Sequence, residues 1–375
     1  MKIALVGGIF GRDATHRSKH AVTPETVLLD GFQKAGVDVQ PLGHAQFEPS
    51  DQYDIVHVHH FGKAALKMAV SNTRSRFVFT GHDGMIVTGY ERSWARRQAF
   101  QYVLDKADAL VALSQAEARY FENHGAVGKV HCIPNGIPPE IFSSNANQQD
   151  EKNKRADKGR FDLLYVGQLI ELKGVNFLLE AIQKVRLQHN VHLRLVYHNA
   201  ERESEYKQMV QDLGIALAVE FVGILGPSEL AREYQSADLM VLPSLAECLP
   251  SVVTESLLAG TPVVASSVCG VPEQLDKYGL AVPPGNVPAL VEAIETMIRE
   301  QSRFQALAPE MREYAENKYK PATMVENHLA LYKRLLAESS TESLRKAFWM
   351  DPLVRLGISA YWGRGTQSQK KAVAK

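Results

Sequence analysis

The 375-residue chain has few of the features that mark secreted, membrane-spanning or metal-bound proteins. It contains only three cysteines, which cannot all pair and show no C-x-x-C spacing: Cys132, Cys248 and Cys269. Unpaired thiols of this kind are typical of a reducing compartment. No apolar run approaches the roughly 20 residues that a membrane-spanning helix needs, and the opening MKIALVGG is too short for the core of a signal peptide. A cytoplasmic protein is therefore expected.

The chain also lacks an excess of charge of either sign. Lysine and arginine together number 42, and aspartate and glutamate together number 42. Such a balance creates no overall field toward a polyanion, so no nucleic-acid partner is expected. Hydrophobic residues make up 45% and charged residues 22%, as in a globular protein. A chain of this length exceeds one ordinary core and predicts two domains.

Three familiar ligand motifs are missing or incomplete. There is no convincing D-x-D sequence, and the His57-x-His59 pair has no third ligand at a suitable spacing, so no metal site is expected. Gly7 and Gly8 follow the first apolar run but do not form G-x-G-x-x-G. A tight glycine turn can still present backbone N–H groups to an anion, which makes Gly8 a candidate ligand-binding residue.

Short apolar runs alternate with helical stretches through the first part of the chain. Helix signals appear at Thr23-Pro24-Glu25, where proline is tolerated at the first position, and at Gly36, which ends the helix. The predicted strands are Lys2 to Val6, Val37 to Leu42, Ile55 to Val58, Phe77 to Thr80, Ala109 to Leu113 and Lys129 to Pro134. This alternation predicts an α/β fold with a doubly wound parallel sheet.

The same alternation resumes after a polar segment, residues 145–159, which we interpret as a linker. The strands predicted beyond it are Asp162 to Val166, Val191 to Tyr197, Val219 to Val222, Leu239 to Leu242, Val263 to Ser266 and Leu280 to Val282. A second sheet of the same kind is therefore expected.

The most informative stretch, ADLMVLPSLAECLPSVVTESLLAGTPVVASSVCGVPEQ, covers residues 237–274. It predicts a buried strand, a loop that holds Glu247, a helix from Val252 to Ala259 with Ser251 as its N-cap, and a further strand. Loops at the carboxyl ends of parallel strands bind ligands in open α/β sheets, and a helix N-terminus there suits a phosphate. Glu247 and Glu255 add acceptors for hydroxyl groups, so these residues point to a sugar nucleotide.

This stretch resembles the signature of the family 4 retaining glycosyltransferases: Glu, seven residues, Glu, a small residue and Gly, PVVAS, and G-x-P-E. The residues that match are Glu247, Glu255, Ala259-Gly260, Pro262-Val263-Val264-Ala265-Ser266 and Gly270-Val271-Pro272-Glu273. The resemblance implies a GT-B fold, with two Rossmann-like domains facing each other across the cleft that holds the active site. It places an acceptor-side domain at residues 1–150 and a nucleotide-sugar domain at 160–320. It also implies a helix that crosses back to the first domain at 321–340, and leaves an additional segment at 341–375.

The resemblance also implies roles for individual residues. Lys173 matches the lysine that binds phosphate, Glu255 the carboxylate that binds the ribose, and Glu247 a group that holds the donor sugar together with the Cys248, Leu249, Pro250 and Ser251 backbone. His82 matches a histidine that positions the sugar or the acceptor, and Asp83 is expected to orient its ring. The implied reaction transfers a sugar from a nucleoside-diphosphate sugar, with a UDP-sugar as the leading candidate, to an acceptor hydroxyl. It proceeds with retention and without a metal or other cofactor.

Two positions depart from the family pattern. Gln168 stands where arginine is usual, and glutamine supplies neither its charge nor its two-pronged donor geometry. Cys248 stands where glycine is usual, so the identity of the sugar cannot be carried over. Either Lys173 and the helix N-termini suffice to hold the diphosphate, or another cation takes part, or the enzyme is weak.

Three functions therefore stay open. The first is a transferase in bacterial-type surface polysaccharide or glycolipid synthesis, with a saccharide or lipid-linked acceptor. The second is a weakly active sugar-nucleotide-binding or scaffold protein, and the third is a GT-B epimerase. Residues 341–375 carry seven basic, two acidic and four aromatic residues. That composition suits either peripheral contact with an anionic membrane or packing on the body of the protein.

Overall fold

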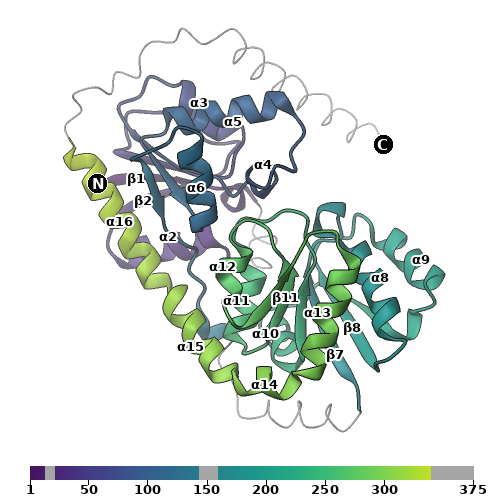
Figure 1. Ribbon diagram of the computed structural model, residues 1–375. Coiled ribbons are helices and arrows are strands. Elements are labelled where there is room, and N and C mark those ends of the chain that lie inside the picture. Colours follow the sequence, from purple (N-terminus) through teal and green to yellow (C-terminus); the bar gives the residue numbers. More distant parts are fainter. Residues whose placement is uncertain (13–21, 143–158, 339–375) are drawn as a thin grey trace. The chain divides into compact units, whose positions relative to one another are not determined.

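The structure is a computed structural model that describes residues 1–12, 22–142 and 159–338 (Figure 1). The chain divides into two compact units: Met1–Gly136 with the segment from Pro321 onward, and Ile137–Lys320. Nearly all of the predicted linker and all of the segment at 341–375 lie outside the described residues. Within the described ranges, every helix is too short or too polar to span a lipid bilayer.

The first unit is built on six parallel strands in the order β2-β1-β3-β4-β5-β6. The strands are β1 (Lys2–Val6), β2 (Asp38–Leu42), β3 (Ile55–His59), β4 (Arg76–Thr80), β5 (Ala109–Ala112) and β6 (Val130–Cys132). The helices are η1 (Gly8–Gly11), α2 (Pro24–Lys34), α3 (Lys63–Val70), α4 (Gly84–Val87), α5 (Trp94–Lys106), α6 (Gln115–Asn123) and α16 (Pro321–Ala337). The doubly wound parallel sheet predicted for this part of the chain is confirmed.

Helix α16 is an integral part of the first unit, although 184 residues separate it from Gly136 in the sequence. It packs against α2, and Figure 1 shows the two helices side by side. A Cβ atom at Gly31 would lie 2.2 Å from Val325 Cγ2, so a glycine is required where these helices meet. Tyr332 of α16 is fully buried and extends the core of the first unit.

The second unit repeats this plan with six parallel strands in the order β12-β11-β10-β7-β8-β9. The strands are β7 (Phe161–Gly167), β8 (Val191–Tyr197), β9 (Val219–Gly223), β10 (Leu239–Leu242), β11 (Val263–Ser266) and β12 (Gly279–Val282). The α-helices are α8 (Val175–Val185), α9 (Glu203–Asp212), α10 (Pro227–Ser236), α11 (Ser251–Leu258), α12 (Val271–Leu275), α13 (Val287–Arg299), α14 (Gln301–Ala306) and α15 (Ala308–Lys318). The short 3-10 turns are η2 (Pro139–Ile141), η3 (Glu171–Lys173) and η4 (Ala216–Ala218).

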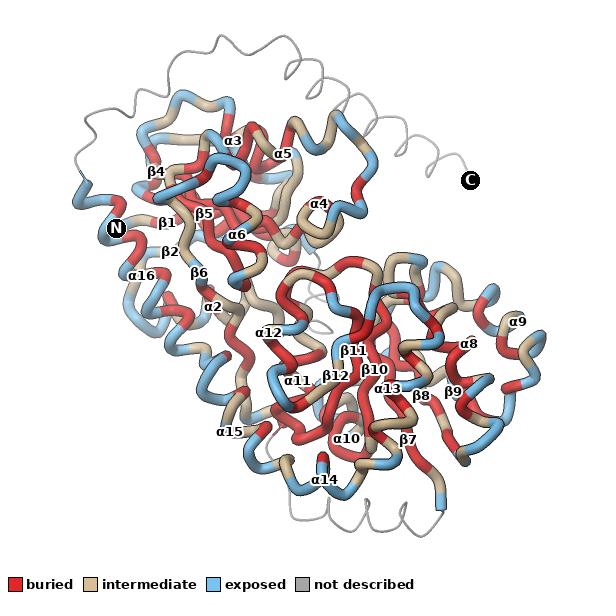
Figure 2. Tube along the Cα trace, in the orientation of Figure 1, coloured by how far each residue is buried: buried red, intermediate tan, exposed pale blue. Residues whose placement is uncertain are grey.

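In both units the central strands are buried on both faces, as the continuous apolar runs in the sequence predict. Figure 2 shows this as buried strands within helices whose outer faces are exposed. Each sheet also has a point where the strand order reverses. It falls between β1 and β3 in the first unit and between β7 and β10 in the second. Open α/β sheets bind ligands beyond the carboxyl ends of the strands at such points.

Candidate active site

Two predicted donor-binding side chains meet at the reversal point of the second sheet. Lys173 follows β7 in the η3 turn, and Glu247 lies in the loop that follows β10. Lys173 Nζ lies 2.6 Å from Glu247 Oε1, although the two residues are 74 positions apart in the sequence. The fold thus brings a cation and a carboxylate together where a ligand is expected.

The backbone fixes this pair from both sides. Leu245 N donates a hydrogen bond to Leu172 O at 2.8 Å, which joins the loop after β10 to the turn after β7. Gly174 adopts φ 66°, and a Cβ atom there would lie 2.2 Å from Pro243 O. Only glycine fits this approach, because the backbone of one loop lies directly against that of the other.

We expect Gly174→Ala to destabilise the second unit and displace Lys173. The left-handed conformation alone costs about 1–2 kcal/mol for an alanine, and the contact with Pro243 adds to that cost. Gly214→Ala is the matched control, because Gly214 has φ 65° but nothing within 4 Å of its added Cβ. Urea denaturation should show the larger loss of stability for Gly174→Ala. Equal losses would mean that the close approach is not a constraint.

Glu255 lies on α11 and accepts a hydrogen bond from Tyr234 on α10, with 2.8 Å between Tyr234 Oη and Glu255 Oε2. Burial raises the pKa of Glu255, while the hydrogen bonds from Tyr234 and Ser251 oppose that rise. No role was predicted for Tyr234 from the sequence. The tyrosine hydroxyl holds one oxygen of the Glu255 carboxylate in place.

Ser251 is not the N-cap of α11, contrary to the prediction. The helix begins one residue earlier, with Pro250 at the N-cap position and Ser251 as the first helical residue. The Ser251 hydroxyl is therefore placed one turn before Glu255 and forms a hydrogen bond with that carboxylate. The N-cap residues, Gly174 of α8 and Pro250 of α11, offer no side-chain acceptor to the first N–H groups of their helices, which suits a ligand at this end of the sheet.

The loop between Glu247 and Ser251 is supported by the segment that follows β11. Gly270 N donates to Cys248 O at 3.0 Å, and Gln274 Nε2 donates to Pro250 O at 3.1 Å. The side chains of Cys248 and Leu249 are buried. Gln274, at the end of the signature stretch, had no predicted role, and here it fixes the backbone of the predicted sugar-binding loop.

Gln168 lies directly beyond β7, where its side chain meets a histidine that the sequence did not identify. Gly167 and Tyr197 are in register at the ends of β7 and β8, so Gln168 and His198 emerge side by side. Gln168 Nε2 lies 3.2 Å from His198 Nε2. Strand pairing is the only signal that could have found His198, because the two residues are far apart in the sequence.

A cluster of histidines occupies the reversal point of the first sheet. The predicted site residues Gly8 and His82 lie there. His60 and His82 follow β3 and β4 with φ of 65° and 51°, a conformation that non-glycine residues rarely adopt outside functional sites. His82 Nε2 lies 3.2 Å from His59 Nδ1, and His60 Nε2 lies 2.9 Å from Glu25 Oε1.

Asp83 does not orient the His82 ring, contrary to expectation. Its carboxylate accepts the N–H of Ile86 as the N-cap of α4 and forms an ion pair with Arg96. The His82 ring instead stacks on His59, with 5.4 Å between the ring centroids. The predicted Gly8 begins η1 at the end of β1, and a Cβ atom there would lie 3.9 Å from the His44 ring.

Burial determines the protonation of this cluster. It lowers the pKa of His59 to about 3 and that of His328 to about 4, and it lowers the pKa of His57 and His82 well below the usual value. Burial alone would raise the pKa of Glu25, but its hydrogen bond with His60 and the nearby imidazoles lower it. A carboxylate near the buried, neutral rings of His59 and His82 is suited to hydroxyl groups, which donate to the carboxylate and accept from a ring N–H.

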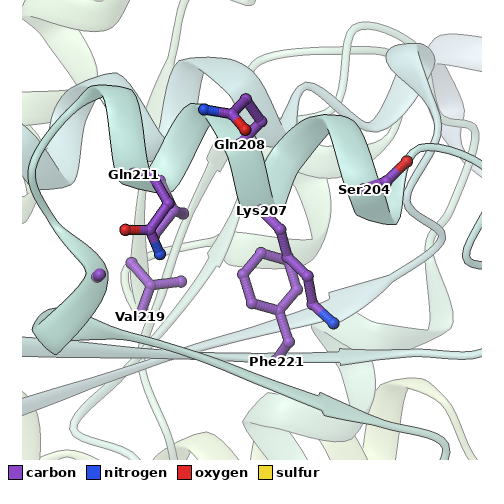
Figure 3. A pocket seen from close by; sticks show the side chains of 8 residues that line it. Ser204, Lys207, Gln208, Gln211, Val219 and Phe221 are labelled. Atoms are coloured by element: carbon purple, nitrogen blue, oxygen red, sulfur yellow. The ribbon is translucent and has the colours of Figure 1, made fainter.

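Two other features bear on where a ligand could bind. Among the described residues, no three histidine, cysteine, aspartate or glutamate side chains are arranged to hold a metal ion. A cavity of about 460 Å³ lies between α9, η4 and β9, where Lys207 extends over the Phe221 ring (Figure 3). None of the predicted site residues lines this cavity.

Comparison with known protein families agrees with the geometry of both units. The model "Glycosyl transferases group 1" matches residues 146–320, and the model "Glycosyltransferase Family 4" matches residues 24–141. Together the two matches span most of the chain. The chain belongs to the family 4, group 1 glycosyltransferases. The predicted family is confirmed.

Two sequence relatives and one solved structure are similar to this chain. An uncharacterized glycosyltransferase of Methanocaldococcus jannaschii is 26% identical over 298 residues, 76% of each chain. The D-inositol 3-phosphate glycosyltransferase of Corynebacterium glutamicum is 25% identical over 285 residues, 70% of this chain and 68% of the relative. Sucrose-phosphate synthase from Thermosynechococcus elongatus superposes with a TM-score of 0.76 at 22% identity, over 90% of this chain and all of that one. These likenesses and the two doubly wound sheets confirm the GT-B fold.

Proposed function

We propose that this glycosyltransferase moves a sugar from a nucleoside-diphosphate sugar to an acceptor hydroxyl, with retention of configuration and without a metal ion. A UDP-sugar is the leading donor. The solved structures of Anabaena HepE, which include complexes with UDP and with UDP-glucose, match this chain with TM-scores of 0.70 and 0.71 at 19% identity. The likeness supports this choice of donor for the present protein.

The observation that carries the proposal is the meeting of Lys173 and Glu247 at the reversal point of the second sheet. The departing diphosphate gains negative charge during transfer and needs donors already aimed at it. Lys173 and the N-termini of α8 and α11 supply such donors. Glu255, held by Tyr234, is placed to receive the ribose hydroxyls, and Glu247 those of the sugar.

The glutamates act as binding groups in this proposal, not as the acid and nucleophile of a glycosidase. The acceptor hydroxyl approaches the anomeric carbon on the face that the diphosphate leaves, and its proton passes to the departing phosphate oxygen. In the first unit, His82 and its neighbours position the sugar or the acceptor through neutral imidazole donors and acceptors.

We place the reaction in the synthesis of a bacterial surface polysaccharide or glycolipid, with a saccharide or lipid-linked acceptor. The basic and aromatic composition of residues 341–375 supports peripheral contact with the inner face of an anionic membrane. Co-sedimentation of the full chain with vesicles that contain phosphatidylglycerol tests this contact. Equal sedimentation after removal of residues 341–375 would contradict it.

Incubation with UDP-glucose and a mixture of saccharide and lipid-linked acceptors is expected to release UDP and form a glycosylated product. Lys173→Met should reduce the rate at least about tenfold, since a charge-assisted hydrogen bond to the diphosphate is worth about 1.5–3 kcal/mol. GDP-, ADP- and TDP-glucose serve as parallel donors. If no donor is hydrolysed or transferred above background, the result would favour a scaffold protein. Conversion of the donor into an isomeric nucleotide sugar would favour an epimerase.

A further inference from the structure

The connection between α4 and α5 in the first unit displays two exposed aromatic side chains. Tyr90 is 39% exposed and Trp94 is 51% exposed. Among the residues that the structure describes, every other phenylalanine, tyrosine and tryptophan is buried or half-buried. Apolar side chains that gather at one exposed place mark a surface for interaction with a partner.

Exposed and inward-facing residues alternate along this connection. Tyr90, Arg92 and Trp94 are exposed, whereas Glu91 is buried and Ser93 is half-buried (Figure 2). The backbone of Ser93 is extended, and residues two apart in an extended chain lie on the same side of it. An arginine therefore stands between the two aromatic residues on one outward side.

Hydrogen bonds fix the backbone beneath these side chains. Glu91 N donates to Met85 O at 2.9 Å, and the Glu91 carboxylate accepts from Ser93 N at 2.7 Å. The guanidinium of Arg97, an exposed residue in the first turns of α5, donates to the carbonyl oxygens of Gly89 and Glu91. The aromatic rings thus project from a preorganised turn, which reduces the conformational freedom lost on binding.

Arg96 connects this turn to the histidine cluster. Its guanidinium lies 3.1 Å from Glu91 Oε2 and also pairs with Asp83, the residue after His82. The surface formed by Tyr90, Arg92, Trp94 and Arg97, here called the α4–α5 surface, is therefore tied to the part of the first unit that carries His82.

The α4–α5 surface is positively charged. Residues 84–104 include three arginines and a single acidic residue, Glu91, which is buried and paired with Arg96. Within the described ranges, neither Arg92 nor Arg97 is paired with a carboxylate. Arginine beside exposed tyrosine and tryptophan is typical of surfaces that meet anionic lipid headgroups.

A saccharide fits the α4–α5 surface less well than a lipid headgroup layer. A sugar-binding site needs a few polar groups placed to receive hydroxyls beside its aromatic rings. The carboxylates at this place, Asp83 and Glu91, are buried and are both occupied by Arg96. The exposed polar groups are cationic, which favours an anionic partner.

We propose that the α4–α5 surface docks the first unit on the headgroup layer of an anionic lipid bilayer. Tyr90 and Trp94 enter the interfacial layer, and Arg92 and Arg97 meet the headgroup phosphates. The inference goes beyond the proposed function, because docking requires neither a bound donor nor residues 341–375. It also brings a lipid-linked acceptor to the side of the first unit that carries His82.

Trp94 itself is the probe for a direct test. The chain contains two other tryptophans, Trp349 and Trp362, so Trp94 is the sole tryptophan in the full chain with Trp349→Phe and Trp362→Phe. Its emission should shift to the blue with phosphatidylglycerol vesicles and should be quenched by brominated phospholipid. Phosphatidylcholine vesicles should cause neither effect.

Three outcomes of this measurement would overturn the inference. Unchanged emission at saturating phosphatidylglycerol would show that Trp94 does not enter the bilayer. Equal quenching in phosphatidylcholine vesicles would contradict the part assigned to the arginines. A shift caused by a soluble oligosaccharide such as maltohexaose, without one caused by vesicles, would assign the surface to a saccharide.

Co-sedimentation of variants of the full chain gives a second test. The double substitution Tyr90→Gln and Trp94→Gln should lower the vesicle partition coefficient at least about tenfold, and Arg92→Gln about fivefold. Leu217→Gln is the matched control, because Leu217 is 94% exposed in the second unit, and it should sediment like the native protein. Equal sedimentation of the double variant and the native protein would contradict docking at this surface. UDP affinity should be the same in both proteins, so failure of lipid docking is distinguished from failure of the proposed donor site.

Discussion

Lowering the pH from 7 to 5 is expected to unfold the first unit while the second unit stays folded. His57, His59, His82 and His328 are kept neutral by burial, and their pKa values in the folded state lie below the unfolded value of about 6.5. The unfolded chain then binds more protons, so stability falls as the pH drops below 6.5. Each such proton costs about 1.4 kcal/mol per pH unit, so His59 and His328, with pKa values of about 3 and about 4, together cost about 4 kcal/mol at pH 5, and His57 and His82 add to this cost.

Glu25 does not offset this loss. The pKa of Glu25 is lowered in the folded state, so its stabilising contribution is present above the unfolded value of about 4.3 and is constant between pH 7 and pH 5. A loss of at least about 4 kcal/mol is a large part of the whole stability of a typical domain, about 5–15 kcal/mol. The first unit should therefore unfold at a higher pH than the second unit.

Hydrogen exchange followed by mass spectrometry resolves the two units. Peptides from β1, β3 and β4 should lose protection near pH 5, while peptides from β7 and β10 keep it. His328→Leu removes one buried imidazole and should shift the transition to lower pH. Simultaneous loss of protection in both units, or a transition of the first unit only below pH 4, would contradict the effect of the histidine cluster.

Glu255→Ala is expected to weaken UDP binding at least about 100-fold. Two hydroxyl hydrogen bonds to a carboxylate are lost, each worth about 1.5–3 kcal/mol. The Tyr234 hydroxyl, which lies on a fully buried side chain, also loses its acceptor. Isothermal titration at pH 7.5 measures the change.

Tyr234→Phe is the matched control for Glu255→Ala. It removes one donor to the carboxylate, so the pKa of Glu255 rises further while the carboxylate itself remains. UDP binding at pH 7.5 should fall less than about tenfold, because the carboxylate is kept and only one hydrogen bond that orients it is lost. Native affinity in Glu255→Ala would remove Glu255 from the donor site.

The strands could be predicted from the sequence because buried parallel strands are short, continuous apolar runs. Lys2–Val6, Val191–Tyr197, Leu239–Leu242 and Val263–Ser266 begin and end as expected. The start of α11 was misplaced by one residue, because serine is a frequent N-cap and competed with Pro250, whose backbone conformation sets the helix start. The N-cap preferences of single residues did not decide between Pro250 and Ser251.

The partners of the site residues could not be predicted in the same way. Lys173 and Glu247 were both identified, but their contact depends on β7 and β10 being neighbours. The contact of Gln168 with His198 and that of Tyr234 with Glu255 were missed, because they arise from strand register and from the packing of α10 on α11. The stacking of His59 on His82 instead of a contact with Asp83 likewise depends on the pairing of β3 and β4. These contacts belong to the tertiary structure, which a single sequence does not display.

A thermal-shift screen against UDP, GDP, ADP and TDP tests the central claim most directly, namely that the reversal point of the second sheet holds a nucleoside diphosphate. At 100 times its dissociation constant, a ligand stabilises the folded state by about 2.7 kcal/mol, which is readily visible as a rise in the midpoint. We expect one nucleotide, UDP first among them, to raise the midpoint of the native protein. Lys173→Ala and Glu255→Ala should lose that rise. No shift with any nucleotide, or an unchanged shift in both variants, would contradict this site.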